Sequence, residues 1–131
     1  MDLRFATPIA EDAACTTARA SWATAKFAVS ANTGDIAWRV PLGAFEELEK
    51  KGLKTGTPSL GGAITTAGNL VFIAATIDGY FRAFDARDGK ELWSTQLPGQ
   101  VNANPMTYRG RSGKQYVAAV ATDSLVAFAL P

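Results

Sequence analysis

Ala83-Phe-Asp-Ala-Arg-Asp-Gly-Lys-Glu-Leu-Trp93 and an earlier stretch, Ala28-Val-Ser-Ala-Asn-Thr-Gly-Asp-Ile-Ala-Trp38, follow one pattern 55 residues apart. Each stretch places a small residue, a turn centred on glycine and a tryptophan at the same spacing. A fixed internal period with strand–turn–strand content is typical of β-repeat proteins, in which each unit buries its apolar faces only against its neighbours. The repeat therefore predicts an all-β fold, and more specifically a segment of a β-propeller.

The residue types in this pattern have a physical rationale as a structural motif. An indole buries a large flat surface between neighbouring sheets, and an alanine opposite leaves room for it. The aspartate can accept backbone N–H groups at the turn, and glycine supplies a positive φ. In the earlier copy Ser30 replaces the aspartate, which predicts a weaker turn. The residues assigned to this structural motif are Ala28, Gly34, Trp38, Ala83, Asp85, Gly89 and Trp93.

Composition excludes several classes of protein. Hydrophobic residues make up 47% of the 131 residues and charged residues 19%, so the chain is globular rather than disordered. A net charge of +1 without a basic run argues against nucleic acid as a partner. The absence of histidine excludes a His-based triad or His-ligated zinc site from this chain alone, and a lone cysteine, Cys15, excludes an internal disulfide. The longest apolar run, 70–75, is far shorter than a membrane span of about 18 residues, and no signal peptide is visible.

Alternating apolar runs and turns predict an irregular lead-in over residues 1–24 and a propeller segment over residues 25–131. Asp78-Gly79 predicts a two-residue type I′ hairpin turn, and a charged, helix-prone insertion is expected at 43–57. Propeller blades have four strands, A to D from the channel outward, so the pattern gives one complete blade at about 61–97 between two partial ones. The nine expected strands are 26–30, 36–40, 63–66, 70–76, 80–85, 91–97, 104–108, 115–121 and 124–129.

The later copy of the motif resembles the tryptophan-docking motif of quinoprotein dehydrogenases. The stretch 56–75, Gly-Thr-Pro-Ser-Leu-Gly-Gly-Ala-Ile-Thr-Thr-Ala-Gly-Asn-Leu-Val-Phe-Ile-Ala-Ala, is similar to the C-terminal region of membrane-bound glucose, quinate and related dehydrogenases. Asn104-Pro-Met-Thr-Tyr108 and Gly113-Lys-Gln-Tyr-Val117 continue the resemblance in order, and it covers about 28–131. It implies an eight-bladed parent propeller in the periplasm, with pyrroloquinoline quinone (PQQ) and calcium in its channel. It also implies a quinone or cytochrome as the electron acceptor.

The chemistry implied by this resemblance needs groups that the sequence does not place in the channel. In the family an aspartate removes the hydroxyl proton, hydride passes to the quinone, and calcium polarises the quinone oxygens. We expect the acids of this chain to lie at turns, on outer strands or on the exposed insertion, so no residue is assigned as catalytic or as a metal ligand. The glycine-rich, histidine-containing segment that the family carries before its last strand is also absent. These acids are Asp78, Asp85, Asp88, Glu91, Asp123 and the Glu46, Glu47, Glu49 run.

Candidate cofactor-binding residues come from the starts of the A strands, which face the propeller axis. Two adjacent glycines permit either close approach of the backbone to a flat ligand or a tight strand entry, and the sequence leaves both open. The candidates are Leu60, Gly61, Gly62, Asn102 and Asn104.

The sequence therefore predicts the C-terminal propeller portion of a PQQ-dependent dehydrogenase that oxidises a sugar, polyol or alcohol. We do not expect this chain alone to be active or to hold PQQ and calcium by itself. The alternatives are a non-catalytic propeller scaffold for protein contacts, of the kind found in outer-membrane assembly lipoproteins, and an orphan fragment without activity. Because partial blades leave unpaired edges, the expected partners are the missing blades or other copies of the chain.

Overall fold

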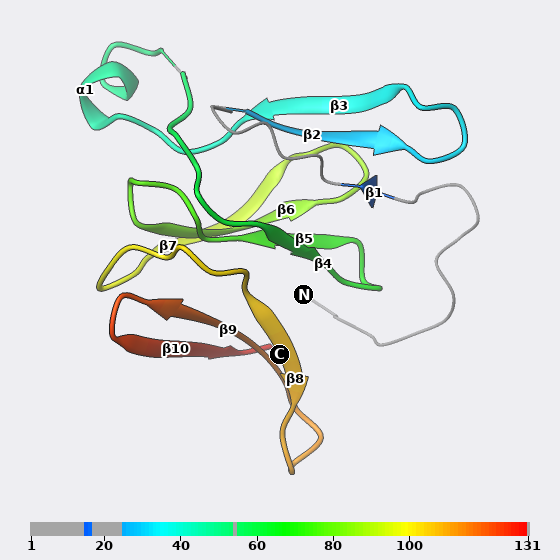
Figure 1. The fold of residues 1–131 in the computed structure, drawn as a ribbon, viewed down its shortest axis with the longest axis vertical. Coiled ribbons are helices and arrows are strands. Elements are labelled where there is room, and N and C mark those ends of the chain that lie inside the picture. Colours follow the sequence, from blue (N-terminus) through cyan, green and yellow to red (C-terminus); the bar gives the residue numbers. More distant parts are fainter. Residues whose placement is uncertain (1–14, 17–24, 54, 131) are drawn as a thin grey trace.

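The chain folds into layered antiparallel β-sheets in a computed structural model that describes residues 15–16, 25–53 and 55–130 (Figure 1). The upper sheet in this view contains β1 (Cys15–Thr16), β2 (Ala25–Ser30) and β3 (Ile36–Pro41). The middle sheet contains β4 (Ala63–Thr65), β5 (Leu70–Ile73), β6 (Tyr80–Asp85) and β7 (Glu91–Gln96). The lower sheet contains β8 (Met106–Arg109), β9 (Gln115–Ala121) and β10 (Ser124–Ala129). A short helix, α1 (Glu46–Glu49), lies between β3 and β4.

The predicted division into blades is confirmed. The middle sheet has four strands in the order β4-β5-β6-β7, which is the complete blade expected at about 61–97. The pair β2-β3 precedes it and the set β8-β9-β10 follows it, as expected for C-D and A-B-C strands. The sequence did not predict β1, which pairs with β2 through Cys15↔Ser30 and Thr16↔Val29.

Two local expectations differ from the structure. The predicted type I′ turn at Asp78-Gly79 is wrong, because Gly79 has φ 74° whereas Asp78 is not among the residues with positive φ. The Gly79 N–H instead donates to the Thr76 carbonyl at 3.1 Å, so the turn spans residues 76–79. The strand β8 begins at Met106 rather than at residue 104, because Pro105 has no N–H to donate to a β-ladder.

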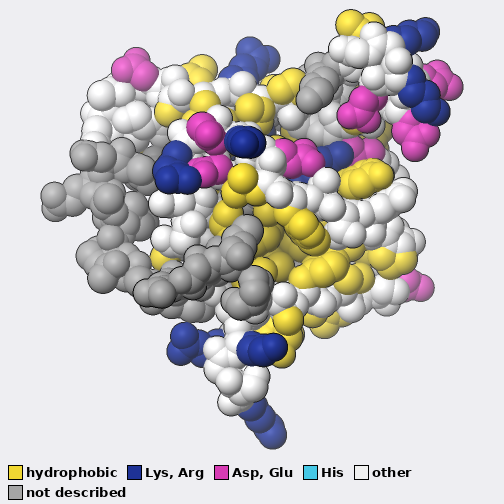
Figure 2. All heavy atoms as spheres, turned by 180° about the vertical axis from the view of Figure 1, so that it is seen from behind, with side chains coloured by type: hydrophobic (Ala, Val, Ile, Leu, Met, Phe, Trp, Pro, Cys, Tyr) yellow, Lys and Arg dark blue, Asp and Glu magenta, His cyan; other side chains and the backbone are white. Residues whose placement is uncertain are grey.

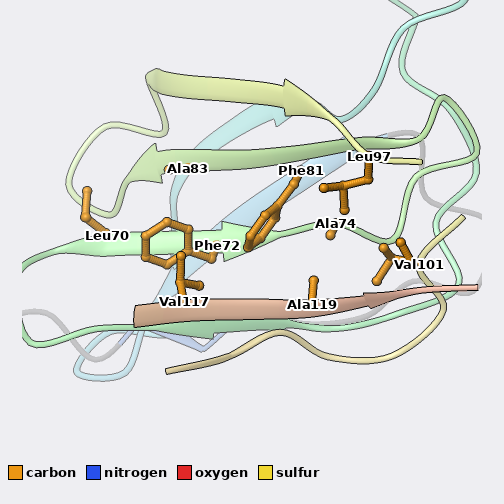
Figure 3. Packing of buried hydrophobic residues seen from close by; sticks show 10 residues of the cluster. Leu70, Phe72, Ala74, Phe81, Ala83, Leu97, Val101, Val117 and Ala119 are labelled. Atoms are coloured by element: carbon orange, nitrogen blue, oxygen red, sulfur yellow. The ribbon is translucent and has the colours of Figure 1, made fainter. Parts of the chain in front are cut away.

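The hydrophobic core covers both faces of the middle sheet. Along β5, every residue from Leu70 to Ile73 is buried, as expected for an inner strand with a sheet on each side. Leu70 and Phe72 face the lower sheet, and Figure 3 shows Phe72 and Phe81 pointing toward β9. Val71 and Ile73 face the upper sheet, and they pack with Leu42, which follows β3, and with Phe84 of β6. Alternation along one strand therefore stabilises both sheet–sheet contacts.

The antiparallel strands collect their connections at two ends of the stack. The β3–β4, β5–β6, β7–β8 and β9–β10 connections form one end, here named the long-loop end. The β2–β3, β4–β5, β6–β7 and β8–β9 turns form the other, here named the hairpin end, and the β8–β9 hairpin projects from it (Figure 1).

Candidate functional site

The residues predicted to face a cofactor lie together at the long-loop end, where β4 and β8 begin. The Gly62 N–H donates to Asn104 Oδ1 at 2.7 Å, which joins the entries of these two strands. The Leu60 N–H donates to the Ala75 carbonyl at 3.0 Å, while its side chain is 60% exposed. Asn102 is also exposed. The structure thus forms one continuous wall from these segments, here named the axial wall (Leu60, Gly61, Gly62, Asn102 and Asn104).

The glycines of the axial wall are explained by contacts within the protein. A Cβ atom on Gly61 would lie 2.6 Å from the Ala75 Cβ and 3.1 Å from the Asn102 carbonyl oxygen. A Cβ atom on Gly62 would lie 2.5 Å from Asn104 Oδ1. The missing side chains therefore allow the β4 and β8 entries to approach each other, which favours the tight-entry alternative. Contact between this wall and a cofactor stays a prediction.

The described residues do not form a metal centre of their own. Within residues 15–16, 25–53 and 55–130, no group of three or more His, Cys, Asp or Glu side chains is arranged to hold a metal ion. A calcium ion requires six to eight oxygen ligands, typically with several carboxylates. The axial wall offers amide and carbonyl oxygens only, and Asn104 Oδ1 already accepts a hydrogen bond. These residues do not fit calcium alone, and they can supply a flat quinone with no more than one side of a pocket.

A buried carboxylate at the same end was not recognised from the sequence. Asp78 Oδ1 accepts hydrogen bonds from the Thr76 hydroxyl, the Tyr80 N–H and Arg82 Nη1. Asp78 Oδ2 accepts from Arg82 Nη2 at 2.6 Å and from the Ala44 N–H at 2.9 Å. The side chains of Arg82 and Asp78 are only 8% and 10% exposed. Asp78 therefore joins the β5–β6 turn to the insertion that carries α1.

The environment of Asp78 also sets its protonation. Burial raises the pKa of the Asp78 carboxyl, but the hydrogen bonds from Arg82, Thr76 and two backbone N–H groups outweigh that effect. Its pKa consequently lies below the ordinary value of 3.8, and the carboxylate is charged at neutral pH. The sequence signal that could have identified this pair is an Asp at 78 and an Arg at 82, four residues apart across a tight turn and the strand after it.

A tryptophan connects the upper and middle sheets at the hairpin end. Trp38 of β3 is 9% exposed, and its Nε1–H donates to the Ala86 carbonyl in the β6–β7 turn at 2.8 Å. The ring also lies against Gly89, where an added Cβ would come within 2.6 Å of Trp38 Cε3. Within its own sheet Trp38 lies opposite Ala28, just as Trp93 lies opposite Ala83. The indole therefore fills the space between an alanine of one sheet and a glycine turn of the next.

The two copies of the motif form the same backbone turn. Gly89 N–H donates to the Asp85 carbonyl at 2.9 Å, and Gly34 N–H donates to the Ser30 carbonyl at 2.8 Å. The Asp85 carboxylate also accepts the Arg87 N–H at 2.9 Å, whereas the Ser30 hydroxyl accepts the Thr33 N–H at a longer 3.4 Å. Hydrogen bonds from Arg87 outweigh burial and lower the pKa of Asp85, so this carboxylate stays charged. A charged acceptor makes the stronger hydrogen bond, which agrees with a weaker turn at Ser30.

Alanine substitutions at the two equivalent glycines should separate backbone strain from indole packing. Gly89 has φ 74° and contacts Trp38, whereas Gly34 has φ 79° and no atom within 4 Å of an added Cβ. Positive φ costs a non-glycine residue roughly 1–2 kcal/mol, and overpacking adds about 1–3 kcal/mol. We expect Gly89→Ala to lower the free energy of unfolding by about 2–4 kcal/mol and Gly34→Ala by about 1–2 kcal/mol. Urea unfolding followed by near-UV circular dichroism measures both, and equal losses would contradict the packing of Trp38 on Gly89.

Three stacked antiparallel sheets joined by interlocking apolar faces define this molecule as a β-propeller segment. The family model described as "PQQ: Glucose/ethanol/alcohol dehydrogenase, beta-propeller domain" matches residues 5–117. The chain therefore belongs to the PQQ β-propeller family of glucose, ethanol and alcohol dehydrogenases.

Known proteins agree with this family assignment. Quinoprotein glucose dehydrogenase A of Acinetobacter calcoaceticus is 40% identical over 118 residues, which cover 79% of this chain and 15% of that protein. The solved structure of a europium-containing methanol dehydrogenase superposes with a TM-score of 0.57 at 33% identity, over 72% of this chain and 14% of that one. BamB from Moraxella catarrhalis has a TM-score of 0.57 at 22% identity, over 85% of this chain and 28% of that one, and so shows the fold alone. The chain thus spans about a seventh of the length of its dehydrogenase relatives.

In the described part of the chain, no helix has the length and apolar character needed to span a membrane.

Proposed function

We propose that this chain contributes propeller blades to a PQQ-dependent dehydrogenase that oxidises a hydroxyl group of a sugar, polyol or alcohol. The observation that carries the proposal is 40% identity to a quinoprotein glucose dehydrogenase over 79% of the chain. PQQ bound in the parent protein would supply the hydride acceptor for this chemistry, and a base of that protein would take the hydroxyl proton. The parent protein would work in the periplasm, use calcium beside its quinone, and pass electrons to a quinone or a cytochrome.

In this proposal the residues of the chain hold the shape of the channel and do not perform the proton transfer. The axial wall closes one side of the channel, with Gly62 and Asn104 fixing its position through their 2.7 Å hydrogen bond. Trp38, seated on Gly89, acts as a tryptophan-docking residue that sets the angle between neighbouring blades. The base and the calcium ligands, in this proposal, belong to parts of the parent protein outside this chain.

The partners in this proposal are further blades of the same propeller. The outer face of the lower sheet leaves Met106, Val120 and Leu125 exposed by 53%, 46% and 65%. The edge strand β10 carries no charge and no proline, so it lacks the usual protection against strand addition. Without further blades, the same face and edge would lead the chain to self-associate.

A non-catalytic scaffold is the alternative function. A two-residue turn favours it, because Ala121 pairs with Ser124 and Thr122–Asp123 close the hairpin. The resemblance to the dehydrogenases implies a longer segment at this position. Thr122 adopts φ 54° there, which is unusual for a β-branched residue. The likeness to BamB supports the fold only and does not favour either function.

A chimera tests the two functions. Residues 25–131 would replace the matching segment of the Acinetobacter calcoaceticus enzyme, with and without that enzyme's own segment restored between Thr122 and Asp123. We expect PQQ-dependent dye reduction with glucose at least in the restored chimera, and none from the isolated chain supplied with PQQ and calcium. Turnover by the isolated chain would contradict the assignment of the catalytic groups. Two folded chimeras that bind no PQQ would favour the scaffold.

A further inference from the structure

The β8–β9 hairpin carries a concentration of positive charge that the proposed chemistry does not use. Arg109, Arg111 and Lys114 are all exposed, and from Leu92 to Thr122 the sequence contains no Asp or Glu. Figure 2 shows dark blue side chains on this projection, while the acidic side chains of the described residues lie over other parts of the visible face. Among the residues that the structure describes, these three cations form a local positive surface on a nearly neutral chain, here named the basic hairpin (residues 109–114).

The basic hairpin is ordered by its own hydrogen bonds. The Gly110 N–H donates to the Lys114 carbonyl at 2.8 Å, and the Gly113 N–H donates to the Gly110 carbonyl at 3.0 Å. Gly113 has φ 79°, which permits this tight turn. Behind the turn Tyr108 and Tyr116 stack with ring centroids 5.2 Å apart and an interplanar angle of 13°. Because the backbone is fixed, the three charges stay together at the end of the projection.

We propose that the basic hairpin is a docking surface for an anionic lipid bilayer. A projecting, convex tip meets a flat charged surface without needing a complementary cleft, whereas an acidic protein partner would have to provide a concave one. Electrostatic attraction to a membrane acts within about 10 Å, so charges at a projecting tip contribute most. The exposed Tyr108 directly behind the cations also suits the headgroup region, where tyrosine is enriched. This inference goes beyond the proposed dehydrogenase function and does not depend on it.

Sedimentation with vesicles tests the proposal on the 131-residue chain, cleared of aggregates beforehand. One vesicle is pure phosphatidylcholine and the other contains about 30% phosphatidylglycerol, at about 20 mM and about 300 mM salt. A cation near an anionic surface contributes about fivefold to binding, so three cations contribute about 100-fold. We expect that preference for the anionic vesicle at low salt, and its loss at high salt.

Two triple variants locate the effect. The test variant is Arg109→Gln, Arg111→Gln and Lys114→Gln, and the matched control is Lys50→Gln, Lys51→Gln and Lys90→Gln. Both remove three exposed positive charges, so the net charge of the two variants is equal. We expect about a 100-fold loss in the test variant and less than about a threefold change in the control. Equal losses, or no preference of the original chain for phosphatidylglycerol, would overturn the proposal.

Two further measurements keep the result interpretable. Near-UV circular dichroism checks the folding of the test variant, and Lys114→Gln alone, with about a fivefold loss expected, replaces it if the triple variant is unfolded. Polyglutamate serves as a soluble acidic probe. Salt-sensitive binding to polyglutamate without binding to anionic vesicles would assign the hairpin to an acidic protein and overturn the lipid proposal.

Discussion

Phe81→Ala should lower the free energy of unfolding by about 3–5 kcal/mol, the range typical for aromatic truncation in a core. Phe81 has 0% exposure and lies at the centre of an aromatic cluster. Its ring centroid is 5.8 Å from Phe72, 5.8 Å from Trp93 and 5.9 Å from Phe128. Alanine would leave a cavity between the middle and lower sheets, because strands paired on both sides cannot collapse into it.

Phe45→Ala is the matched control, since Phe45 lies on the insertion and is 42% exposed. We expect that change to cost less than about 1 kcal/mol. Urea unfolding of both variants at one chain concentration measures the difference. Similar losses for the two variants would mean that the contact between the middle and lower sheets contributes little to stability.

Asp78→Asn should be the most damaging polar substitution, with an expected loss of about 3 kcal/mol. Asparagine removes the negative charge from a buried pair. It also turns an amide N–H group toward the groups that donate hydrogen bonds to the carboxylate. Arg82 would keep a 3.5 Å contact with Glu91, whose side chain is 44% exposed, and this contact does not replace the lost partner. Because Ala44 also loses its acceptor, the insertion should show faster amide exchange.

The pH dependence gives a second readout for Asp78. Its folded-state pKa lies below the ordinary 3.8, so the stability that it contributes is present above that value. This contribution is lost as the pH falls below about 3.8 toward the folded pKa, because the native state must then take up a proton. We expect the original chain to lose more stability between pH 5 and pH 2 than Asp78→Asn does. If the two proteins lost the same free energy of unfolding over this pH range, the lowered pKa of Asp78 would be contradicted.

Strand positions could be predicted because their signals are local. The apolar run at Leu70–Ile73 and the alternation around Tyr80–Asp85 lie within single strands, and both strands form there. Gly34 and Gly89 lie at turns that need positive φ, which is a property of the residue itself. The type of the turn at Asp78–Gly79 was predicted wrongly because Asp78 is recruited by Arg82 and Ala44, and Ala44 lies 34 residues away. A competing tertiary contact thus overrode the local preference.

The sequence by itself determined the order of the strands from β2 to β10, the division into blades and the family, because these follow from repeats and from identity along the chain. Tertiary structure alone revealed why Gly61 and Gly62 are glycines, since the atoms that exclude a side chain belong to Ala75, Asn102 and Asn104. It likewise showed that Trp38 binds the Ala86 carbonyl across a sheet boundary, and that Asp78 holds the insertion. Contacts between residues far apart in sequence depend on how the sheets pack, and no local pattern records that packing.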